Sequence, residues 1–145
     1  GAGSGGGESV EERLEGLVTL AKRLRRNGKP VWEDGAVRDK IMKIFTRAEG
    51  FRQMFRRARV DALCDHPMRI PLQSKLLISE LMQDAAALAL EIQGAHGSLY
   101  LGDERAPDAA AWPLAYMNSY GITIAAGTSE VQRNILGERV LGLPK

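Results

Sequence analysis

The sequence has very few of the side chains that bind metals or form disulfides. Its 145 residues include one cysteine, Cys64, and two histidines. A single cysteine excludes an internal disulfide and is typical of a protein from a reducing compartment. One cysteine and two histidines also cannot fill a closed four-ligand zinc site. We therefore interpret residues 64–67, which hold Cys64 and one histidine, as an ordinary connector and expect no metal site.

Long apolar runs and an excess of charge are also missing. No apolar segment reaches the roughly 18 residues that a membrane-spanning helix needs. The N-terminus has neither the basic start nor the apolar segment of a secretory signal, so we expect a cytoplasmic protein. The formal net charge of +2 is too close to zero to indicate a nucleic-acid or membrane partner. With 44% apolar and 26% charged residues, the composition is typical of one globular domain.

Residues 1–7 read Gly-Ala-Gly-Ser-Gly-Gly-Gly and match the spacing of a dinucleotide-binding loop. That loop must follow a strand and open a βαβ unit, and no strand precedes this one. We interpret residues 1–7 as a flexible leader, either an engineered scar or a loop cut upstream. The domain itself is then expected to cover residues 8–145.

The rest of the chain consists of helical patterns. The first predicted helix covers about residues 8–26, with Ser9 as its cap, Glu12 three residues later, and an apolar stripe formed by Val10, Leu14, Leu17, Val18, Ala21 and Leu24. The residues Asn-Gly-Lys-Pro at 27–30 are expected to end it.

The second predicted helix covers residues 36–63, is capped by Asp34 and has an inward apolar face made of Val37, Ile41, Ile44, Phe45, Ala48, Phe55 and Ala62. Its outer face carries seven basic residues, which could contact phosphates. Because Asp39, Glu49 and Asp61 interrupt them, a solvated or subunit-facing surface is the favoured interpretation.

Two further helices are predicted before the C-terminal segment. One covers residues 71–93, with Pro71 in its first turn and an alanine run at 85–87 that indicates close helix–helix approach. The other covers residues 108–119, is capped by Asp108 and is broken by Gly121. The alternating residues 122–124 are too few to outweigh the helices. With a final helix, these patterns predict an all-α fold, an antiparallel four-helix-bundle-type domain with short extra C-terminal helices.

The C-terminal segment is the most specific pattern. Residues 127–134 read Gly-Thr-Ser-Glu-Val-Gln-Arg-Asn, and residues 138–144 read Glu-Arg-Val-Leu-Gly-Leu-Pro. Gly127 permits a bend, Thr128 or Ser129 can cap the next helix, and Glu130 suits its first turn. An apolar face is expected to follow at Val131, Ile135, Leu136 and Val140. The run closely resembles the terminal signature of the acyl-CoA dehydrogenase family.

The resemblance covers the chain after the leader, and it is to the C-terminal helical domain only. A complete family member also has an N-terminal helical domain and a middle β domain. The resemblance implies an FAD-dependent enzyme that oxidises an acyl-CoA substrate to its 2,3-enoyl thioester. A carboxylate removes the α proton while hydride passes from the β carbon to flavin N5. It also implies an electron-transferring flavoprotein or a similar acceptor as partner, and a homodimer or homotetramer.

No catalytic residue is expected in this chain. In one branch of the family the base is the Glu that directly precedes the Gly-Thr-Ser run, but here that position is Ala126. In a second branch the base lies on the first long helix, which would place it upstream of residue 1. Glu8, Glu11 and Glu12 are interpreted as helix-start acids without a catalytic role. The chain alone is therefore expected to be inactive.

The resemblance nevertheless implies five cofactor-binding residues. Thr128 and Glu130 correspond to flavin contacts of the signature, although simple capping of the helix explains both residues equally well. The family's Gln-x-x-Gly-Gly-x-Gly loop appears at residues 91–97, where Glu91 replaces the Gln, Gly94 is kept and Ala95 replaces a Gly. Glu91 adds charge near a pyrophosphate, and the neighbouring Gln93 is an alternative contact.

A third family motif, Arg-x-x-Phe-Gly-Lys-Pro, is present only in part. Leu24 replaces its phosphate-binding Arg and Asn27 replaces its flavin-packing Phe, while Arg23 and Arg25 flank the gap. Two hypotheses follow from these departures. The protein is either a divergent acyl-CoA dehydrogenase or a non-catalytic helical subunit that scaffolds a heteromeric dehydrogenase complex.

Overall fold

The predicted all-α fold is confirmed in a computed structural model, which describes residues 9–144. Five α-helices make up most of the domain: α1 (Val10–Arg23), α2 (Gly35–Arg57), α3 (Arg69–Gln93), α4 (Ala111–Ile124) and α5 (Ser129–Arg139). The connections contain a hairpin of β1 (Arg25–Arg26) and β2 (Lys29–Pro30) and the 3₁₀ turns η1 (Val31–Glu33), η2 (Asp61–Leu63), η3 (Gly94–Ser98) and η4 (Pro107–Ala110). The expected leader at residues 1–7 lies outside the described residues, so the division into leader and domain stays a prediction.

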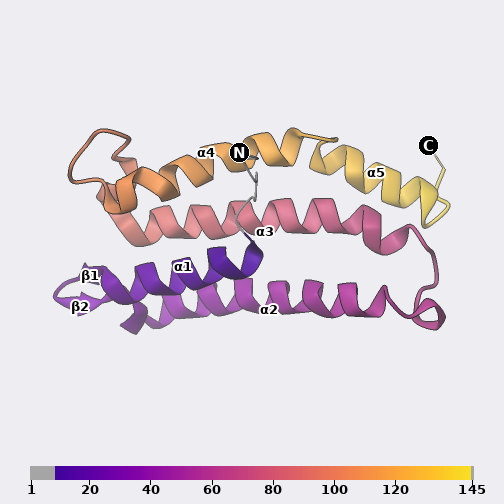
Figure 1. Cartoon of the computed structure of the whole chain (residues 1–145), viewed down its shortest axis with the longest axis horizontal. Helices are drawn as coiled ribbons and strands as arrows, with labels where there is room; N and C mark the ends of the chain where they lie inside the picture. Colours follow the sequence, from indigo (N-terminus) through magenta and orange to yellow (C-terminus); the bar gives the residue numbers. More distant parts are fainter. Residues whose placement is uncertain (1–8, 145) are drawn as a thin grey trace, which may run out of the picture.

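Helix α3 is the central element of the bundle (Figure 1). Helices α1 and α2 lie on one side of it, and α4 and α5 follow one another along the other side. The arrangement is a four-helix-bundle type in which α4 and α5 together fill the fourth position. Among the described residues, no helix has both the length and the apolar character needed to cross a membrane.

The core forms where α1, α2 and α3 meet. Its largest fully buried side chains are Leu17, Leu20, Ile41 and Leu81. Leu20 was missing from the predicted stripe, although it lies one turn after Leu17 and on the same face. Ala85 and Ala86 are fully buried, whereas Ala87 is exposed, so the first two small residues lie at the close approach of α3 to its neighbours.

Two predicted helix ends were placed too far along the chain. The first helix ends at Arg23, because residues 25–30 form a hairpin whose turn has positive φ at Asn27 (53°) and Gly28 (79°). Asn-Gly is the preferred sequence for such a turn. The second helix ends at Arg57, whose side chain donates a hydrogen bond to the carbonyl of Leu63 and closes the following loop.

Part of the predicted inward face of the second helix is therefore exposed. Phe55 has 41% of its surface accessible, and Ala62 lies in the exposed η2 turn. Four of the seven basic residues form ion pairs with carboxylates: Lys40 with Glu91, Lys43 with Asp39, Arg47 with Asp84, and Arg52 with Glu49. These pairs compensate much of the positive charge locally.

The prediction for the fourth helix was wrong at both ends. Asp108 has φ 51° and does not cap α4, which begins at Ala111; its carboxylate instead accepts a hydrogen bond from Arg23 at 2.7 Å. The helix then continues through Gly121 to Ile124 and includes the alternating residues 122–124. A glycine inside a helix costs only about 1 kcal/mol, which the packing of α4 on α3 can outweigh.

Candidate functional site

The signature run forms a tight turn between α4 and α5. After α4 ends at Ile124, Ala126 and Gly127 have φ values of 56° and 100°, in the left-handed region that favours glycine. A Cβ added to Gly127 would lie 2.9 Å from the side-chain nitrogen of Gln132. Both the backbone and the packing therefore require glycine at position 127.

Thr128 and Glu130 lie together at the start of α5. The Oγ1 of Thr128 accepts a hydrogen bond from the amide of Val131 at 3.3 Å, so Thr128, and not Ser129, is the cap. The exposed carboxylate of Glu130 accepts hydrogen bonds from its own backbone amide and from Thr128, which hold its pKa below the ordinary value. The structure thus places both predicted cofactor residues side by side and shows that both take part in capping.

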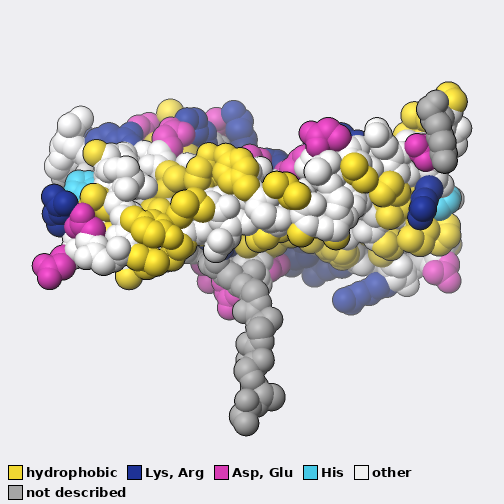
Figure 2. Space-filling view, turned by 90° about the horizontal axis from the view of Figure 1, so that it is seen from above, with side chains coloured by type: hydrophobic (Ala, Val, Ile, Leu, Met, Phe, Trp, Pro, Cys, Tyr) yellow, Lys and Arg dark blue, Asp and Glu magenta, His cyan; other side chains and the backbone are white. Residues whose placement is uncertain are grey.

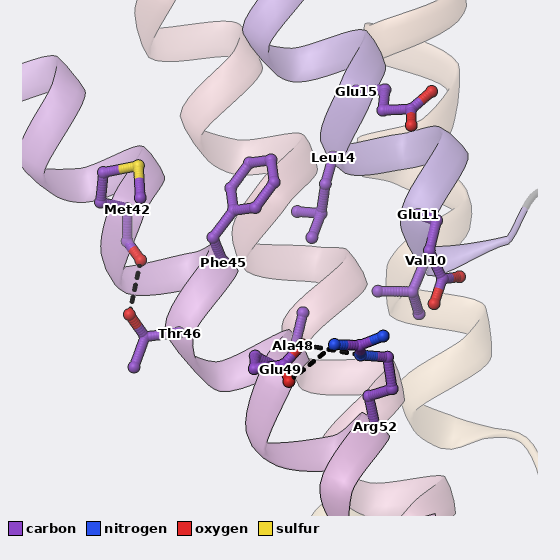
Figure 3. Close-up of a pocket in the computed structure, with 10 residues that line it drawn as sticks. All are labelled: Val10, Glu11, Leu14, Glu15, Met42, Phe45, Thr46, Ala48, Glu49 and Arg52. Atoms are coloured by element: carbon purple, nitrogen blue, oxygen red, sulfur yellow. Dashed lines mark hydrogen bonds and ion pairs between the residues drawn. The ribbon is translucent and has the colours of Figure 1, made fainter.

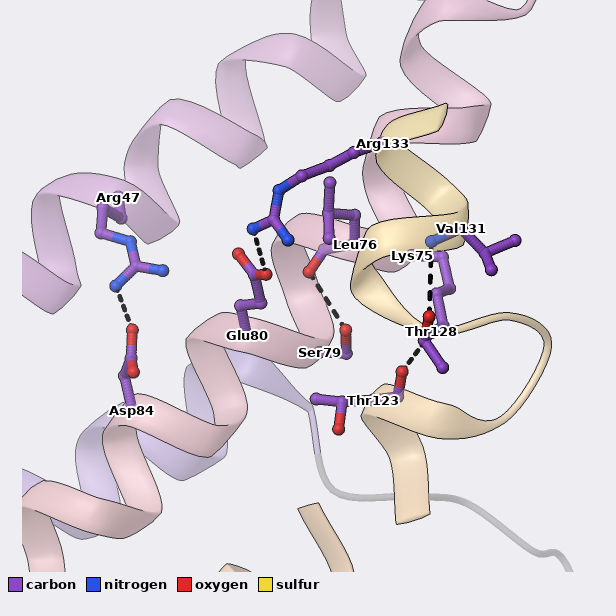
Figure 4. A network of polar contacts seen from close by, with 10 residues as sticks. All are labelled: Arg47, Lys75, Leu76, Ser79, Glu80, Asp84, Thr123, Thr128, Val131 and Arg133. Carbon is purple, nitrogen blue, oxygen red and sulfur yellow. Dashed lines mark hydrogen bonds and ion pairs between the residues drawn. The ribbon is translucent and has the colours of Figure 1, made fainter. Parts of the chain in front are cut away.

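The turn is attached to α3 mainly by polar side chains (Figure 4). Lys75 donates to the carbonyls of Thr123 (3.0 Å) and Gly127 (2.5 Å). From α5, Gln132 donates to the carbonyl of Ala126 at 2.7 Å, and Arg133 pairs with Glu80 at 2.6 Å.

The expected apolar face of α5 is partly buried: Ile135, Leu136 and the following Val140 are half-buried, whereas Val131 is exposed. Val131 is 45% exposed, and the buried residue of α5 is Gln132, at 7% exposure. The reason is that the Gln132 amide satisfies a carbonyl of the turn, which an apolar side chain could not do. The role of Lys75 could not be predicted from the sequence, because a lysine within a helix is usually a solvated surface residue.

The second predicted cofactor region is the C-terminal end of α3. The carboxylate of Glu91 pairs with Lys40 at 2.6 Å, and Arg26 donates to the backbone carbonyl of Glu91 at 3.3 Å. Gly94 has φ 58°, and Ala95 lies exposed in η3. The predicted Glu91 side chain is therefore held by a neighbouring helix, while the Gly94–Ala95 backbone is accessible.

Gln93, the alternative contact, is 5% exposed. Within residues 9–144, neither the nitrogen nor the oxygen of its side-chain amide has a hydrogen-bond partner. Since buried amides are almost always hydrogen-bonded, this side chain has unused capacity for a polar ligand.

The two predicted regions do not meet in one copy of the chain. Lys75 touches the signature turn, whereas Glu91 lies at the other end of α3. At 1.5 Å per helical residue, Lys75 and Glu91 are about 24 Å apart along α3. Two arrangements would bring a cofactor to both regions. Either one long cofactor spans both regions of a single chain, or each region contacts a cofactor together with a second subunit.

The cations beside the altered third motif have local partners. Arg23 forms an ion pair with Asp108 at 2.7 Å, and this contact raises the pKa of the Arg23 guanidinium. Arg25 donates to the carbonyl of Gly28 at 3.3 Å. Neither of these two arginine contacts indicates a phosphate-binding site. Arg26, which sequence reasoning did not single out, is the hairpin arginine that contacts the end of α3.

Of the first acids, Glu12 is a helix-start group in the structure. Glu12 and Ser9 form a reciprocal capping box at the start of α1, with the Ser9 amide 2.8 Å from the Glu12 carboxylate, and Glu8 lies outside the described residues. Among the described residues, no cluster of three or more histidine, cysteine or acidic side chains could hold a metal.

A groove between α1 and α2 is the main apolar hollow near these acids (Figure 3). Its volume is about 520 Å³, and Leu14, Met42 and Phe45 line it together with the Glu49–Arg52 ion pair. None of the five predicted cofactor residues lines this groove.

Comparison with known proteins identifies the family. The family model for the acyl-CoA dehydrogenase C-terminal domain matches residues 3–141 of this chain. The acyl-CoA dehydrogenase IpdE1 of Mycolicibacterium smegmatis is 32% identical over 132 residues, which are 89% of this chain and 30% of that protein. The chain thus spans less than a third of this relative.

Solved structures show the same fold. The FAD complex of PigA is 25% identical, with a TM-score of 0.71 over 92% of this chain and 33% of that chain. The ChsE4–ChsE5 complex from Mycobacterium tuberculosis is 21% identical, with a TM-score of 0.75 over 92% of this chain and 35% of that one, and supports the fold alone. The chain therefore belongs to the acyl-CoA dehydrogenase family and corresponds to its C-terminal helical domain.

Proposed function

We propose that this chain is the C-terminal part of an FAD-dependent acyl-CoA dehydrogenase that converts an acyl-CoA thioester into the 2,3-enoyl-CoA. The observation that carries the proposal is the signature turn, in which Gly127 and Thr128 lead into the exposed N-terminus of α5. The proposed location is the cytoplasm, and the proposed electron acceptor is an electron-transferring flavoprotein or a similar protein.

The proposed role of the turn is to contact the flavin. FAD, when bound, supplies the hydride acceptor. Thr128 offers a hydroxyl at the N-terminus of α5, where the helix dipole suits an anionic or carbonyl oxygen. The carboxylate of Glu130 now uses that hydroxyl and would have to turn outward, which its exposed position permits.

The proposed role of the second region is to contact the dinucleotide part of the cofactor. The backbone of Gly94 and Ala95 is accessible, and the unpartnered amide of Gln93 lies next to it. Lys40 neutralises Glu91, which removes the repulsion that a free carboxylate would exert on a pyrophosphate. Glu91, Gly94 and Ala95 are thus proposed to border the cofactor, with the Glu91 side chain turned toward α2.

The separation of the two regions supports a second subunit. We propose a homodimer or homotetramer in which the signature turn and the end of α3 serve different cofactors. The outer face of α4 supports an association surface, because Met117, Tyr120 and Ile124 are exposed by 48%, 48% and 63%. Figure 2, which looks onto the α4 and α5 side, shows apolar side chains gathered along this face. Exposed apolar patches of this kind commonly mark interaction sites.

We propose that the base comes from outside the described residues. Ala126 occupies the position before Gly127 and cannot accept a proton. The chain therefore contributes cofactor contacts and subunit contacts, and the proton-abstracting carboxylate belongs to another part of the protein.

The alternative function is a non-catalytic subunit of a heteromeric dehydrogenase complex. It is favoured by Ala126 and by the loss of the motif residues at Leu24 and Asn27. Such a subunit would keep the fold and the turn without binding its own flavin.

Dye-coupled oxidation of acyl-CoA substrates tests the proposal. We expect no turnover from the 145-residue chain and measurable turnover from the longest natural form of the protein. Turnover by the chain alone would contradict the assignment of the base to another part. A longest form that is colourless and inactive would favour the scaffold function.

A further inference from the structure

Lys75 makes an unusual contact for a surface lysine. It lies in the first half of α3, and its partly buried ammonium donates to the carbonyl of Thr123 at 3.0 Å (Figure 4). The same ammonium donates to the carbonyl of Gly127 at 2.5 Å. Among residues 9–144, no carboxylate lies within ion-pair distance of it. The cation is therefore directed at backbone oxygens.

Both carbonyls need such a donor. Thr123 lies in the last turn of α4, where carbonyls lack helical partners and the helix dipole is negative. Gly127 lies in the turn with positive φ, and no backbone amide of the described residues is recorded as donating to its carbonyl. One ammonium group thus joins the end of α4 to the residue before the α5 cap.

The contact also orients Thr128. The carbonyl of Gly127 and the amide of Thr128 belong to one planar trans peptide group, in which they point in opposite directions. Fixing the Gly127 carbonyl against Lys75 consequently fixes the direction in which the Thr128 amide points.

The remaining attachments of α5 do not hold the Gly127 carbonyl. The Gln132 bond is made to Ala126, and the Arg133–Glu80 pair lies beyond the first turn, with Arg133 53% exposed. Val131 is exposed, so apolar packing contributes little at the start of α5.

We propose that Lys75 is a positioning residue, which holds the Ala126–Thr128 turn in the conformation that presents Thr128 to the flavin. The inference rests on the proposed flavin-contacting role of Thr128. Its structural part, the rigidity of the turn, can be measured without any cofactor.

Amide hydrogen exchange on the chain tests the structural part. In Lys75→Met, exchange of the Val131 and Gln132 amides, which bond Thr128, is expected to accelerate by roughly tenfold, because a charged hydrogen bond is lost. The amides of Ile41 and Ile44 in α2 should stay unchanged. Lys43→Met is the control, since Lys43 is 73% exposed and, among the described residues, pairs with Asp39 on its own helix. Unchanged exchange at Val131 and Gln132 in a folded Lys75→Met protein would overturn the proposal.

Lys75→Arg keeps the charge and the donors, and it should restore slow exchange. Lys75→Leu, which removes every donor and keeps a strong helix former, carries the same test if Lys75→Met does not fold; exchange as slow as in the wild type would overturn the proposal.

FAD titration of the longest natural form tests the functional part. Lys75→Met should weaken FAD binding by roughly tenfold, with recovery in Lys75→Arg and no change in Lys43→Met. Unaltered FAD affinity together with faster exchange would reduce Lys75 to a fold stabiliser and overturn its role toward flavin. A wild-type protein that binds no FAD would refute the proposed function, while exchange would still decide whether Lys75 holds the turn.

Discussion

At Gly127 the backbone and the neighbouring side chains impose the same requirement. The φ of 100° is unfavourable for any residue with a Cβ, and the space that a Cβ would need is filled by Gln132. Gln132 cannot move away freely, because its amide holds the carbonyl of Ala126. The turn is therefore fixed by contacts on both sides of the chain.

Gly127→Ala should destabilise the domain by about 1–3 kcal/mol, through the positive φ and the contact with Gln132. Gly121→Ala is the matched control, because Gly121 lies inside α4 and an added Cβ meets no atom within 4 Å. That variant should be neutral or more stable by about 0.5–1 kcal/mol. Urea unfolding measures both, and equal stability of the two variants would contradict this account of the turn.

Residue patterns limited the cap to Thr128 or Ser129 but did not predict its support. Capping depends on residues within one turn of each other, so Thr128 and Glu130 could be found in the sequence. The hydrogen bond from Lys75 to Gly127 joins residues 52 positions apart. Its acceptor is a backbone carbonyl, so no residue type in the sequence indicates this partner. The Lys40–Glu91 pair was likewise hidden, since it joins two helices.

Among the elements, helix existence was predicted better than helix ends. Apolar spacing identified α1, α2 and α3, because these helices bury one face each. The predicted ends were wrong where tertiary contacts are involved. The Arg57 side chain closes the loop after α2 through the Leu63 carbonyl, and the Asp108 carboxylate bonds Arg23 and does not cap α4. Helix α4 is apolar on nearly all sides, so its pattern gave no periodic signal.

The outer face of α2 predicts a specific response to acid. Hydrogen bonds from Arg52, and then from Gln53, lower the pKa of Glu49 from 4.5 to about 2. A carboxylate with a lowered pKa stabilises the fold above its unfolded pKa, and this stabilisation is lost as the pH falls from about 4.5 to about 2. Because both partners are about half exposed, the effect should be small and weaken in salt.

Glu49→Gln should therefore lower Tm slightly at neutral pH, and its difference from the wild type should vanish near pH 2, in thermal melts followed by circular dichroism. Asp39→Asn, which removes a similarly exposed ion pair with Lys43, controls for the loss of one charge. A difference between Glu49→Gln and the wild type that stays constant down to about pH 2 would show that the pair does not act through this titration.

For the whole molecule, the exposed side of α4 is the main feature that the single chain does not explain. Met117, Tyr120 and Ile124 follow helical spacing along that side, and Tyr116 and Tyr120 join through their hydroxyls at 2.6 Å. The opposite side of α4 packs on α3. A helix that is apolar all round is expected to be covered on both sides.

Ile124→Glu should weaken self-association by at least about tenfold, because a charge would be buried in the apolar contact. Leu63→Glu is the control, since Leu63 in η2 is 53% exposed but lies away from α4. Sedimentation velocity over a range of concentrations measures both. A wild-type chain that stays monomeric at high concentration would refute this interface.

Flavin titration of Thr128 variants in the longest natural form of the protein tests the central claim most directly. Thr128→Asp keeps a good helix cap but replaces the hydroxyl by a negative charge. We predict that it remains about as stable as the wild type and binds FAD at least about tenfold more weakly, whereas Thr128→Ser retains both properties. A Thr128→Asp protein that binds FAD like the wild type would show that Thr128 only caps α5, and it would contradict the claim that this turn contacts the flavin.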